Sequence, residues 1–257
     1  MPAVTSGVVP MESREREVPG VKIEIWSDVV CPWCYIGKRR FEAALAEFPQ
    51  RDQLEVEWKS FELDPGAESA TARSDSDNGY AERLASKYGT TPRAAQKMLD
   101  DMTTTAATVG LEYHFELASH ANTFDAHQVI HLGLERGVQD AVKERLLKAY
   151  FTEGALIGDH ETLARLGAEA GLDADEVRTA LAEQRYAAAV RSDEAEAAQL
   201  GISGVPFFVV DRKYGVNGAQ PPEQILELLR RAWSEAHPLT VVGAGDGQAC
   251  GPDGCPV

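Results

Sequence analysis

The feature that most constrains this chain is a pair of cysteines, Cys31 and Cys34, between an apolar run and a helix-like stretch. The apolar run, Val21 to Trp26, predicts a strand, and Pro32 to Phe48 carries apolar residues at helical spacing. Two thiols at this spacing can close a disulfide, and the positive end of a helix dipole stabilises a thiolate at the helix start. Reversible thiol chemistry is therefore the first hypothesis.

A zinc site is the alternative for such a cysteine pair, and it usually needs a second pair at similar spacing. Pro32 favours the redox interpretation, because proline lacks an amide proton that could point at sulfur and suits the first position of a helix. Apolar residues follow Cys34 at helical spacing as far as Phe48, which predicts that the Cys34 face is buried. Cys31 would stay at the open end and attack, and Cys34 would resolve the mixed disulfide.

Composition and charge exclude several function classes. The chain has 257 residues, of which 44% are hydrophobic and 26% charged, with a formal charge of -16. This predicts a globular protein that repels phosphate groups, so we expect neither nucleic acids nor membranes as partners. No apolar run approaches the ~20 residues of a membrane span, and Met1 to Gly20 has no apolar export signal. With only four cysteines, a cytoplasmic redox role fits better than an exported, disulfide-stapled protein.

The predicted elements form a βαβ unit, a helical block and a ββα unit. Leu54 to Phe61 alternates between apolar and polar residues and predicts the second strand. From Tyr80 to about Leu200 almost every segment has a helical pattern. Val205 to Val210 is an apolar run, Lys213 to Val216 predicts a short partner strand, and Pro222 to Trp233 predicts an amphipathic helix.

Five segments of the sequence carry a family resemblance. They are SDVVCPWCYIG (Ser27 to Gly37), NTFDAH (Asn122 to His127), AYFTEG (Ala149 to Gly154), GISGVPFFV (Gly201 to Val209) and NGAQPPE (Asn217 to Glu223). Over roughly Val21 to Trp233 the chain resembles the DsbA-like thioredoxin superfamily, most closely its FrnE-type branch. The resemblance implies an α/β, thioredoxin-like fold with a large all-helical insertion. The expected parts are a mobile arm (1–20), a thioredoxin-like domain (21–64 and 186–236), the helical insertion (65–185) and a flexible tail (237–257).

The resemblance also implies roles for individual residues. Cys31 would be the nucleophile, Cys34 the resolving thiol, and Pro206 a cis-proline facing them. A cis bond would turn the chain sharply and leave the backbone of Val205 unpaired, ready to bind an extended substrate; the alternative is a trans proline that opens an edge strand. The candidates for substrate contact are Val205, the two residues between the cysteines and two residues of the NTFDAH segment: Pro32, Trp33, Asn122 and His127.

These roles predict a thiol-disulfide oxidoreductase that reduces, oxidises or isomerises protein disulfides through a mixed disulfide. Its partners would be protein or low-molecular-weight thiols and disulfides, and no cofactor or metal is expected; the oligomeric state stays open. Cytoplasmic placement favours reduction or isomerisation. One alternative is a glutathione-dependent transferase or isomerase of the kappa-class or hydroxychromenecarboxylate-isomerase type, whose members usually carry a single serine at the first motif position. The other is a metal-binding thiol protein without turnover.

Three polar residues near these motifs have ambiguous roles. Asp28, three residues before Cys31, would accept a proton or cap the helix start, and we expect a cap or solvent role because short acidic residues commonly satisfy helix amides. His127 and His131 lie four apart, a spacing that can clasp a metal. HQVIH lacks the acidic residue of the HExxH motif, so we expect packing or cleft lining for His127 and no role for His131.

A second cysteine pair, Cys250 and Cys255, lies in a Gly-rich tail. Pro252, Asp253 and Gly254 between them predict a turn that can close a small loop. Three interpretations stay open: a redox relay to the first pair or a regulatory disulfide, a shared metal, or an idle exposed pair. A mobile tail favours exchange, because it can bring a thiol into reach without distorting the core.

Overall fold

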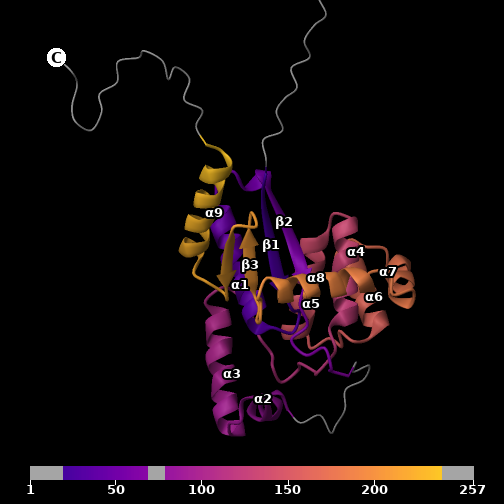
Figure 1. Cartoon of the computed structure of the whole chain (residues 1–257). Helices are drawn as coiled ribbons and strands as arrows, with labels where there is room; N and C mark the ends of the chain where they lie inside the picture. The colour runs from indigo at the N-terminus through magenta and orange to yellow at the C-terminus, as the bar shows by residue number, and fades with distance from the viewer. Residues whose placement is uncertain (1–19, 69–78, 239–257) are drawn as a thin grey trace, which may run out of the picture.

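The structure is a computed structural model that describes residues 20–68 and 79–238. Its centre is a four-stranded sheet in the order β2-β1-β3-β4, shown in Figure 1. The strands are β1 (Val21–Ser27), β2 (Leu54–Ser60), β3 (Phe207–Val210) and β4 (Tyr214–Asn217). β1 pairs in parallel with β2 and antiparallel with β3, which pairs antiparallel with β4. The predicted α/β class and the strand positions are confirmed.

The helices of the described residues follow the predicted order. They are α1 (Pro32–Ala46), α2 (Tyr80–Tyr88), α3 (Pro92–Ala107), α4 (Phe124–Glu135), α5 (Gln139–Phe151), α6 (His160–Glu169), α7 (Ala174–Ala182), α8 (Ala187–Gln199) and α9 (Pro222–Ala236), with a short 3-10 turn at Arg51–Gln53. Capping side chains fix several helix starts, as at α3, where the Thr91 hydroxyl accepts a hydrogen bond from the Ala94 amide at 3.2 Å. The first helix ends at Ala46, two residues before the predicted end.

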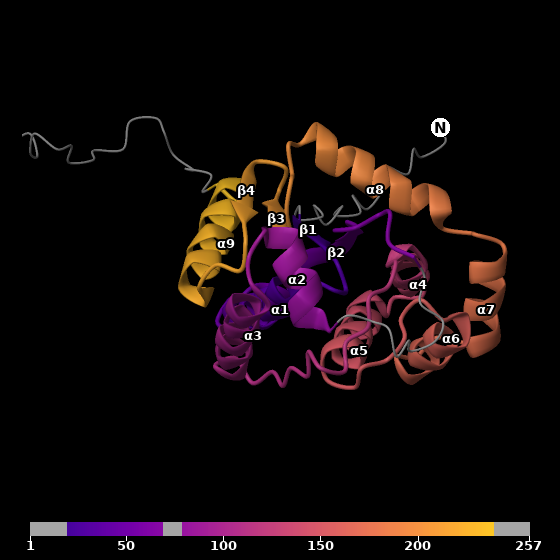
Figure 2. The ribbon, with the colours of Figure 1, turned by 90° about the horizontal axis from the view of Figure 1, so that it is seen from below.

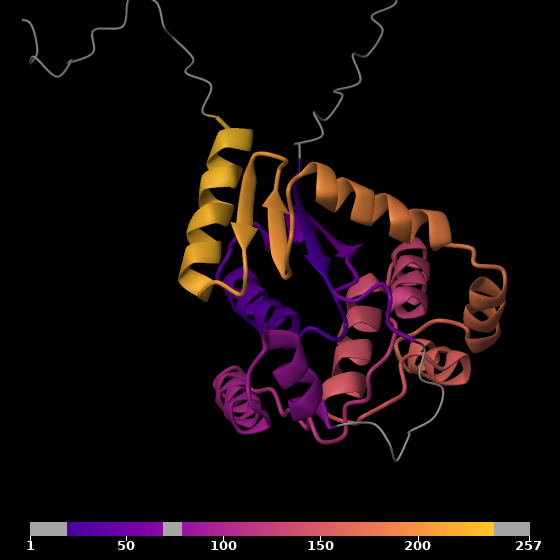
Figure 3. The ribbon, with the colours of Figure 1, turned by 60° about the horizontal axis from the view of Figure 1, so that its bottom comes forward.

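One hydrophobic core joins the sheet to the helices between β2 and β3. It contains Ile23 and Phe208 from the strands together with Val129, Leu146 and Leu166 from α4, α5 and α6. α1 and α9 pack together, while α4, α5 and α8 contact β2. α2 and α3 form a hairpin that lies below the sheet in Figure 1 and in front of α1 in the view from below (Figure 2); Figure 3 shows it away from α6 and α7. Both β1, which precedes the dithiol, and α1, which follows it, are therefore fixed by this core.

Some predictions fall outside the described residues. These are most of the N-terminal arm, most of the predicted loop at 67–79, and the cysteines Cys250 and Cys255. Within residues 20–68 and 79–238, none of the helices combines the length and apolar character that a membrane span requires.

Candidate active site

The two cysteines lie at the start of α1, as predicted. Cys31 is the N-cap residue, Pro32 opens the helix, and the Cys34 amide donates a hydrogen bond to the Cys31 carbonyl at 3.0 Å. Both cysteines are free thiols. Cys34 is fully buried, whereas Cys31 keeps 4% of its surface exposed and lines a pocket. Cys31 is thus the sulfur that a substrate can reach.

The Val205–Pro206 peptide bond is cis, which confirms the expected cis-proline. The Cys31 thiol donates a hydrogen bond to the Val205 carbonyl, with sulfur and oxygen 3.5 Å apart. Val205 precedes β3, and within the described part of the chain its amide makes no hydrogen bond. The backbone of Val205 is therefore available beside the thiol for an extended ligand.

The loop at Pro206 packs directly on α1. A Cβ atom added to Gly37 would lie 2.9 Å from the Pro206 ring carbon Cγ. Tyr113 holds the other side of the same helix start, because its hydroxyl donates to the Pro32 carbonyl at 2.7 Å. Sequence reasoning missed Tyr113, since no local pattern links it to a carbonyl 81 residues away.

A buried lysine lies behind the dithiol. Lys143 of α5 is fully buried, donates a hydrogen bond to the Ser27 carbonyl at 3.2 Å and lies 5.8 Å from the centre of the Trp58 ring. Burial lowers its pKa from 10.5 to about 8. At neutral pH the ammonium group therefore remains mostly charged. Sequence reasoning missed this residue; its only signal was a place beside the apolar stripe of its helix.

The two thiols influence each other's pKa. Burial opposes ionisation of Cys34, but the adjacent Cys31 thiol and the positive charge of Lys143 outweigh it and lower the pKa of Cys34. The adjacent Cys34, together with burial, raises the pKa of Cys31 well above its usual range. The pair thus loses its first proton easily and its second with difficulty. This differs from the expected isolated thiolate on Cys31, because Cys34 lies close enough to take the charge.

Asp28 and His127 form a second buried group beside the thiols. Asp28 accepts a hydrogen bond from the Leu63 amide at 2.8 Å, and its other carboxylate oxygen lies 3.4 Å from His127 Nε2. Burial opposes ionisation of Asp28, yet His127 and the Leu63 amide lower its pKa; burial also lowers the pKa of His127. The expected cap or solvent role of Asp28 is wrong, because the side chain is fully buried and the α1 N-cap has no side-chain partner.

His131 is linked to structural partners, contrary to the expectation of no role. Its Nε2 lies 3.0 Å from an Asp193 carboxylate oxygen and 3.1 Å from the Ser60 hydroxyl, so it joins α4 to α8 and β2. In the described residues no group of three or more His, Cys, Asp or Glu side chains is placed to hold a metal ion. The spacing of His127 and His131 does not create such a site there.

Asn122 lies outside the pocket. Its side-chain amide donates to a Glu62 carboxylate oxygen at 3.2 Å, and its side-chain oxygen accepts from the Phe124 amide at 2.9 Å at the start of α4. These contacts join the segment after β2 to α4. The structure thus brings together Cys31, Cys34, Val205, Pro206, Pro32 and Trp33, with His127 behind them, but not Asn122.

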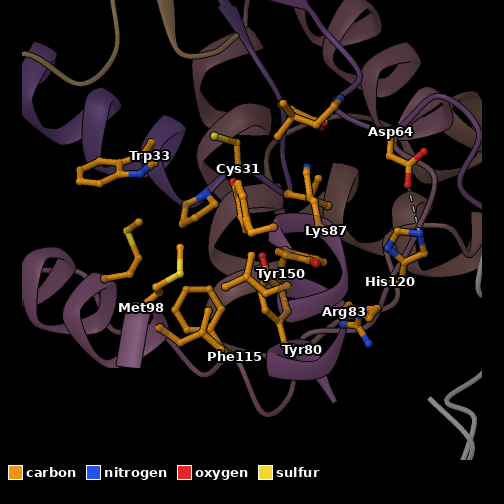
Figure 4. A pocket seen from close by; sticks show the side chains of 18 of the residues that line it. Cys31, Trp33, Asp64, Tyr80, Arg83, Lys87, Met98, Phe115, His120 and Tyr150 are labelled. Carbon is orange, nitrogen blue, oxygen red and sulfur yellow. Dashed lines mark hydrogen bonds and ion pairs between the residues drawn. The ribbon is translucent and has the colours of Figure 1, made fainter. Parts of the chain in front are cut away.

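A pocket of about 940 Å³ opens beside Cys31. Figure 4 shows Trp33 and Met98 on the same side of it, with Tyr80, Phe115 and Tyr150 below the cysteine. Its walls come from the dithiol segment, from the α2–α3 hairpin and from the segment before α4. The volume falls in the range of sites that bind small ligands or a few side chains.

Comparisons with known proteins identify the family. The sequence profile of the DSBA-like thioredoxin domain matches residues 22–230. The chain belongs to this family. It is 47% identical to a probable DsbA oxidoreductase from Streptomyces coelicolor, whose crystal structure matches with a TM-score of 0.78 over 92% of this chain and 99% of that one.

Two further relatives lie at greater distance from this DSBA-like protein. The uncharacterized protein YwbO of Bacillus subtilis is 29% identical over 192 residues, 74% of this chain and 86% of YwbO. The cytosolic disulfide reductase DsbM of Pseudomonas aeruginosa, solved with GSH, shares the fold with a TM-score of 0.56 at 18% identity, over 82% of this chain and 98% of DsbM. The DsbA-like resemblance and the thioredoxin-like fold are confirmed.

Proposed function

We propose that this DSBA-like protein reduces or isomerises disulfides of proteins in the cytoplasm, with Cys31 as nucleophile and Cys34 as resolving thiol. The observation that carries the proposal is the reachable Cys31 thiol, 3.5 Å from the carbonyl of Val205 at the cis peptide bond. A free dithiol at a helix start supplies the chemistry, and the unpaired Val205 amide supplies a place for a substrate backbone. Thiol-disulfide exchange takes place between the sulfur atoms of the two partners, so the proposed reaction includes no cofactor.

The reaction is a two-electron exchange. The Cys31 thiolate attacks one sulfur of a substrate disulfide; that bond breaks, a mixed disulfide forms, and the second substrate sulfur leaves as a thiolate that takes up a proton. The Cys34 thiolate then attacks the Cys31 sulfur, which closes the Cys31–Cys34 disulfide and releases the first substrate sulfur. The substrate is reduced by two electrons and the protein oxidised by two. A dithiol or monothiol reductant restores the free thiols, and isomerisation uses the first step alone.

Proton transfer between the thiols precedes the attack. Because the pKa of Cys34 is lowered and that of Cys31 raised, the first proton leaves Cys34, and the Cys31 proton must pass to Cys34 before Cys31 becomes a nucleophile. In the second step Cys34 must again lose its proton, and we assign its acceptance to the buried Asp28 carboxylate, which lines the pocket beside Cys31. Lys143 stabilises the thiolate in both steps, since its charge acts through a medium of low dielectric constant.

The test is a pair of cysteine substitutions assayed on a protein disulfide with dithiothreitol as reductant. We expect Cys31→Ser to abolish turnover, and Cys34→Ala to stop after the first step and accumulate mixed disulfides that mass spectrometry detects. The Cys250→Ser/Cys255→Ser double variant is the control for thiols elsewhere in the chain. Normal turnover by Cys31→Ser would disprove the assigned nucleophile.

A further inference from the structure

The buried side of the dithiol carries polar atoms that lack hydrogen-bond partners. Asp28 Oδ1 and both ring nitrogens of His127 are buried and make no hydrogen bond within the described residues. The carboxylate oxygen lies 3.4 Å from His127 Nε2. Buried polar atoms are nearly always paired, so orphaned atoms beside a reactive group indicate a chemical role or an ordered water. Packing alone therefore does not account for the Asp28–His127 pair.

The two members of this pair border different parts of the molecule. Asp28 lines the pocket beside Cys31, whereas His127 is not among the residues that line it. His127 lies on α4, which contacts β2 and is away from the α2–α3 hairpin in Figure 1 and Figure 2. Asp28 thus lies between the dithiol on one side and the interior around α4 on the other.

A second histidine, His131, follows His127 on the same face of α4. Residues four apart in a helix have Cβ atoms about 5–6 Å from each other, and one water molecule can bridge such a gap between two imidazoles. His131 Nε2 lies 3.0 Å from the carboxylate of Asp193, which also lies 3.1 Å from the Lys59 ammonium group. The Lys59 side chain is 13% exposed. This series of ionisable groups therefore leads from the dithiol to the surface.

The charges around His127 favour a group that takes up a proton and passes it on. Burial, together with the positive charges of Lys143 on α5 and of His131, lowers the pKa of His127, while Asp28 raises it. The imidazole is therefore neutral at pH 7 and holds an added proton only transiently. A neutral imidazole has one nitrogen that accepts and one that donates, so it can receive a proton on one side and release another on the other side.

The second step of the exchange produces a proton that needs such a route. Cys34 gives its proton to Asp28, the disulfide with Cys31 forms, and the substrate sulfur leaves as a thiolate that takes up a proton from water. During this step a polypeptide held at Cys31 and Val205 lies over the pocket side of Asp28. The proton on the carboxylate then reaches water through the interior, which restores the carboxylate for the next cycle.

We propose that the two histidines of the HQVIH segment, His127 and His131, carry a proton from Asp28 to the protein surface while substrate covers the dithiol. This inference rests on the proposed disulfide exchange and adds the route of its proton. It also gives a function to the HQVIH spacing, which places two imidazoles on one helix face but forms no metal site in the described residues. Both histidines act through Asp28, and the sulfur chemistry stays with the two cysteines.

The experiment measures the two steps separately by rapid acid quench and mass spectrometry, which distinguishes the free thiols, the mixed disulfide and the Cys31–Cys34 disulfide. The substrates are a synthetic peptide with an intramolecular disulfide, which covers the pocket, and hydroxyethyl disulfide, whose small group leaves Asp28 open to water. We expect His127→Gln to slow the second step with the peptide by about 100-fold, the lower end of what a positioned proton-transfer group contributes. Its second step with hydroxyethyl disulfide, and its first step with either substrate, should keep the wild-type rate.

Two further variants locate the effect. Glutamine keeps a hydrogen-bonding group but cannot carry a proton, so His131→Gln should show the same selective slowing, and it decides the test if His127→Gln fails to fold. The control is His160→Gln. It removes an imidazole that lies 2.7 Å from Asp125, near the start of the same helix, and both steps should keep their wild-type rates with both substrates.

Two results would overturn the inference. One is an unchanged second step with the peptide in His127→Gln and His131→Gln. The other is equal slowing with both substrates, which a purely structural role of the histidines would produce. Either result leaves the disulfide exchange intact. Failure of the wild-type protein to form a mixed disulfide at Cys31 would instead overturn the proposed function itself.

Discussion

At the scale of single residues, the two buried lysines near Trp58 differ in how their charges are paired. Lys38 and Lys143 lie 5.9 and 5.8 Å from the centre of that ring. Lys38 forms ion pairs with Glu42, Asp140 and Glu144, whereas Lys143 has no ion pair within the described segments. A buried charge without a carboxylate partner is costly. Its persistence beside the dithiol fits a role in holding the thiolate.

We therefore expect Lys143→Met to raise the free energy of unfolding and to lower the reactivity of the thiols. With a folded pKa of about 8, below the usual 10.5, the unfolded chain binds more protons between these two pH values, so stability rises with pH in that window. Methionine removes this dependence, and below pH 8 it should increase the free energy of unfolding by about 1–3 kcal/mol. The rate of thiol alkylation at pH 7 should fall by about fivefold, because the thiolate loses its cation. Urea unfolding at pH 7 and 10 and alkylation by iodoacetamide measure the two effects.

The control is Lys148→Met, which makes the same replacement on the exposed face of α5. It should change neither the alkylation rate nor the pH dependence of stability. If Lys143→Met left the alkylation profile at its wild-type position, the lysine would be a packing residue rather than a positioning residue for the thiolate.

At the scale of elements, the sequence predicted what depends on neighbours along the chain. The start of α1 at Cys31 and Pro32 and the four strands all follow from local patterns. The role of Asp28 did not, because its partners Leu63 and His127 come from other elements. The same reason explains why Lys143 was missed: a lysine in a helix usually faces water, and nothing local shows that Ser27 and the dithiol lie against it.

The contact between α1 and the cis-proline loop gives a prediction for Gly37→Ala. Alanine would favour the helix by up to about 1 kcal/mol, but its Cβ would lie 2.9 Å from the Pro206 ring, and such overpacking costs about 1–3 kcal/mol. The clash should dominate and move the loop away from Cys31. We expect lower thermal stability and a kcat/KM for disulfide reduction reduced by about tenfold. Gly79→Ala, whose added Cβ would meet no atom within 4 Å, serves as the control; equal effects in both variants would contradict a specific contact.

At the scale of the whole molecule, the shared core decides which elements lie beside the dithiol. The helical segment was predicted from periodicity, but its patterns do not show that the α2–α3 hairpin reaches Cys31, because that placement depends on packing across the core. The same core ends at α9, where Leu229 and Ala232 are buried and the Trp233 ring meets Phe48 edge-on at 6.0 Å. α9 is thus anchored in this core up to Trp233.

Deletion of residues 245–257 should therefore leave the stability of the fold unchanged and slow the re-reduction of the Cys31–Cys34 disulfide. The deletion removes Cys250 and Cys255 and leaves intact the core that the described residues form, so we expect the Tm to change by less than about 2 °C. If the tail cysteines relay electrons, tethering gives them a high effective concentration near the Cys31–Cys34 disulfide, and their loss should slow its regeneration by dithiothreitol by about twofold or more. Stopped-flow measurement of thiol release resolves this step, and the Cys250→Ser/Cys255→Ser variant at full length should show the same slowing. Identical regeneration rates in all three proteins would reject a relay and leave the second cysteine pair outside the catalytic cycle.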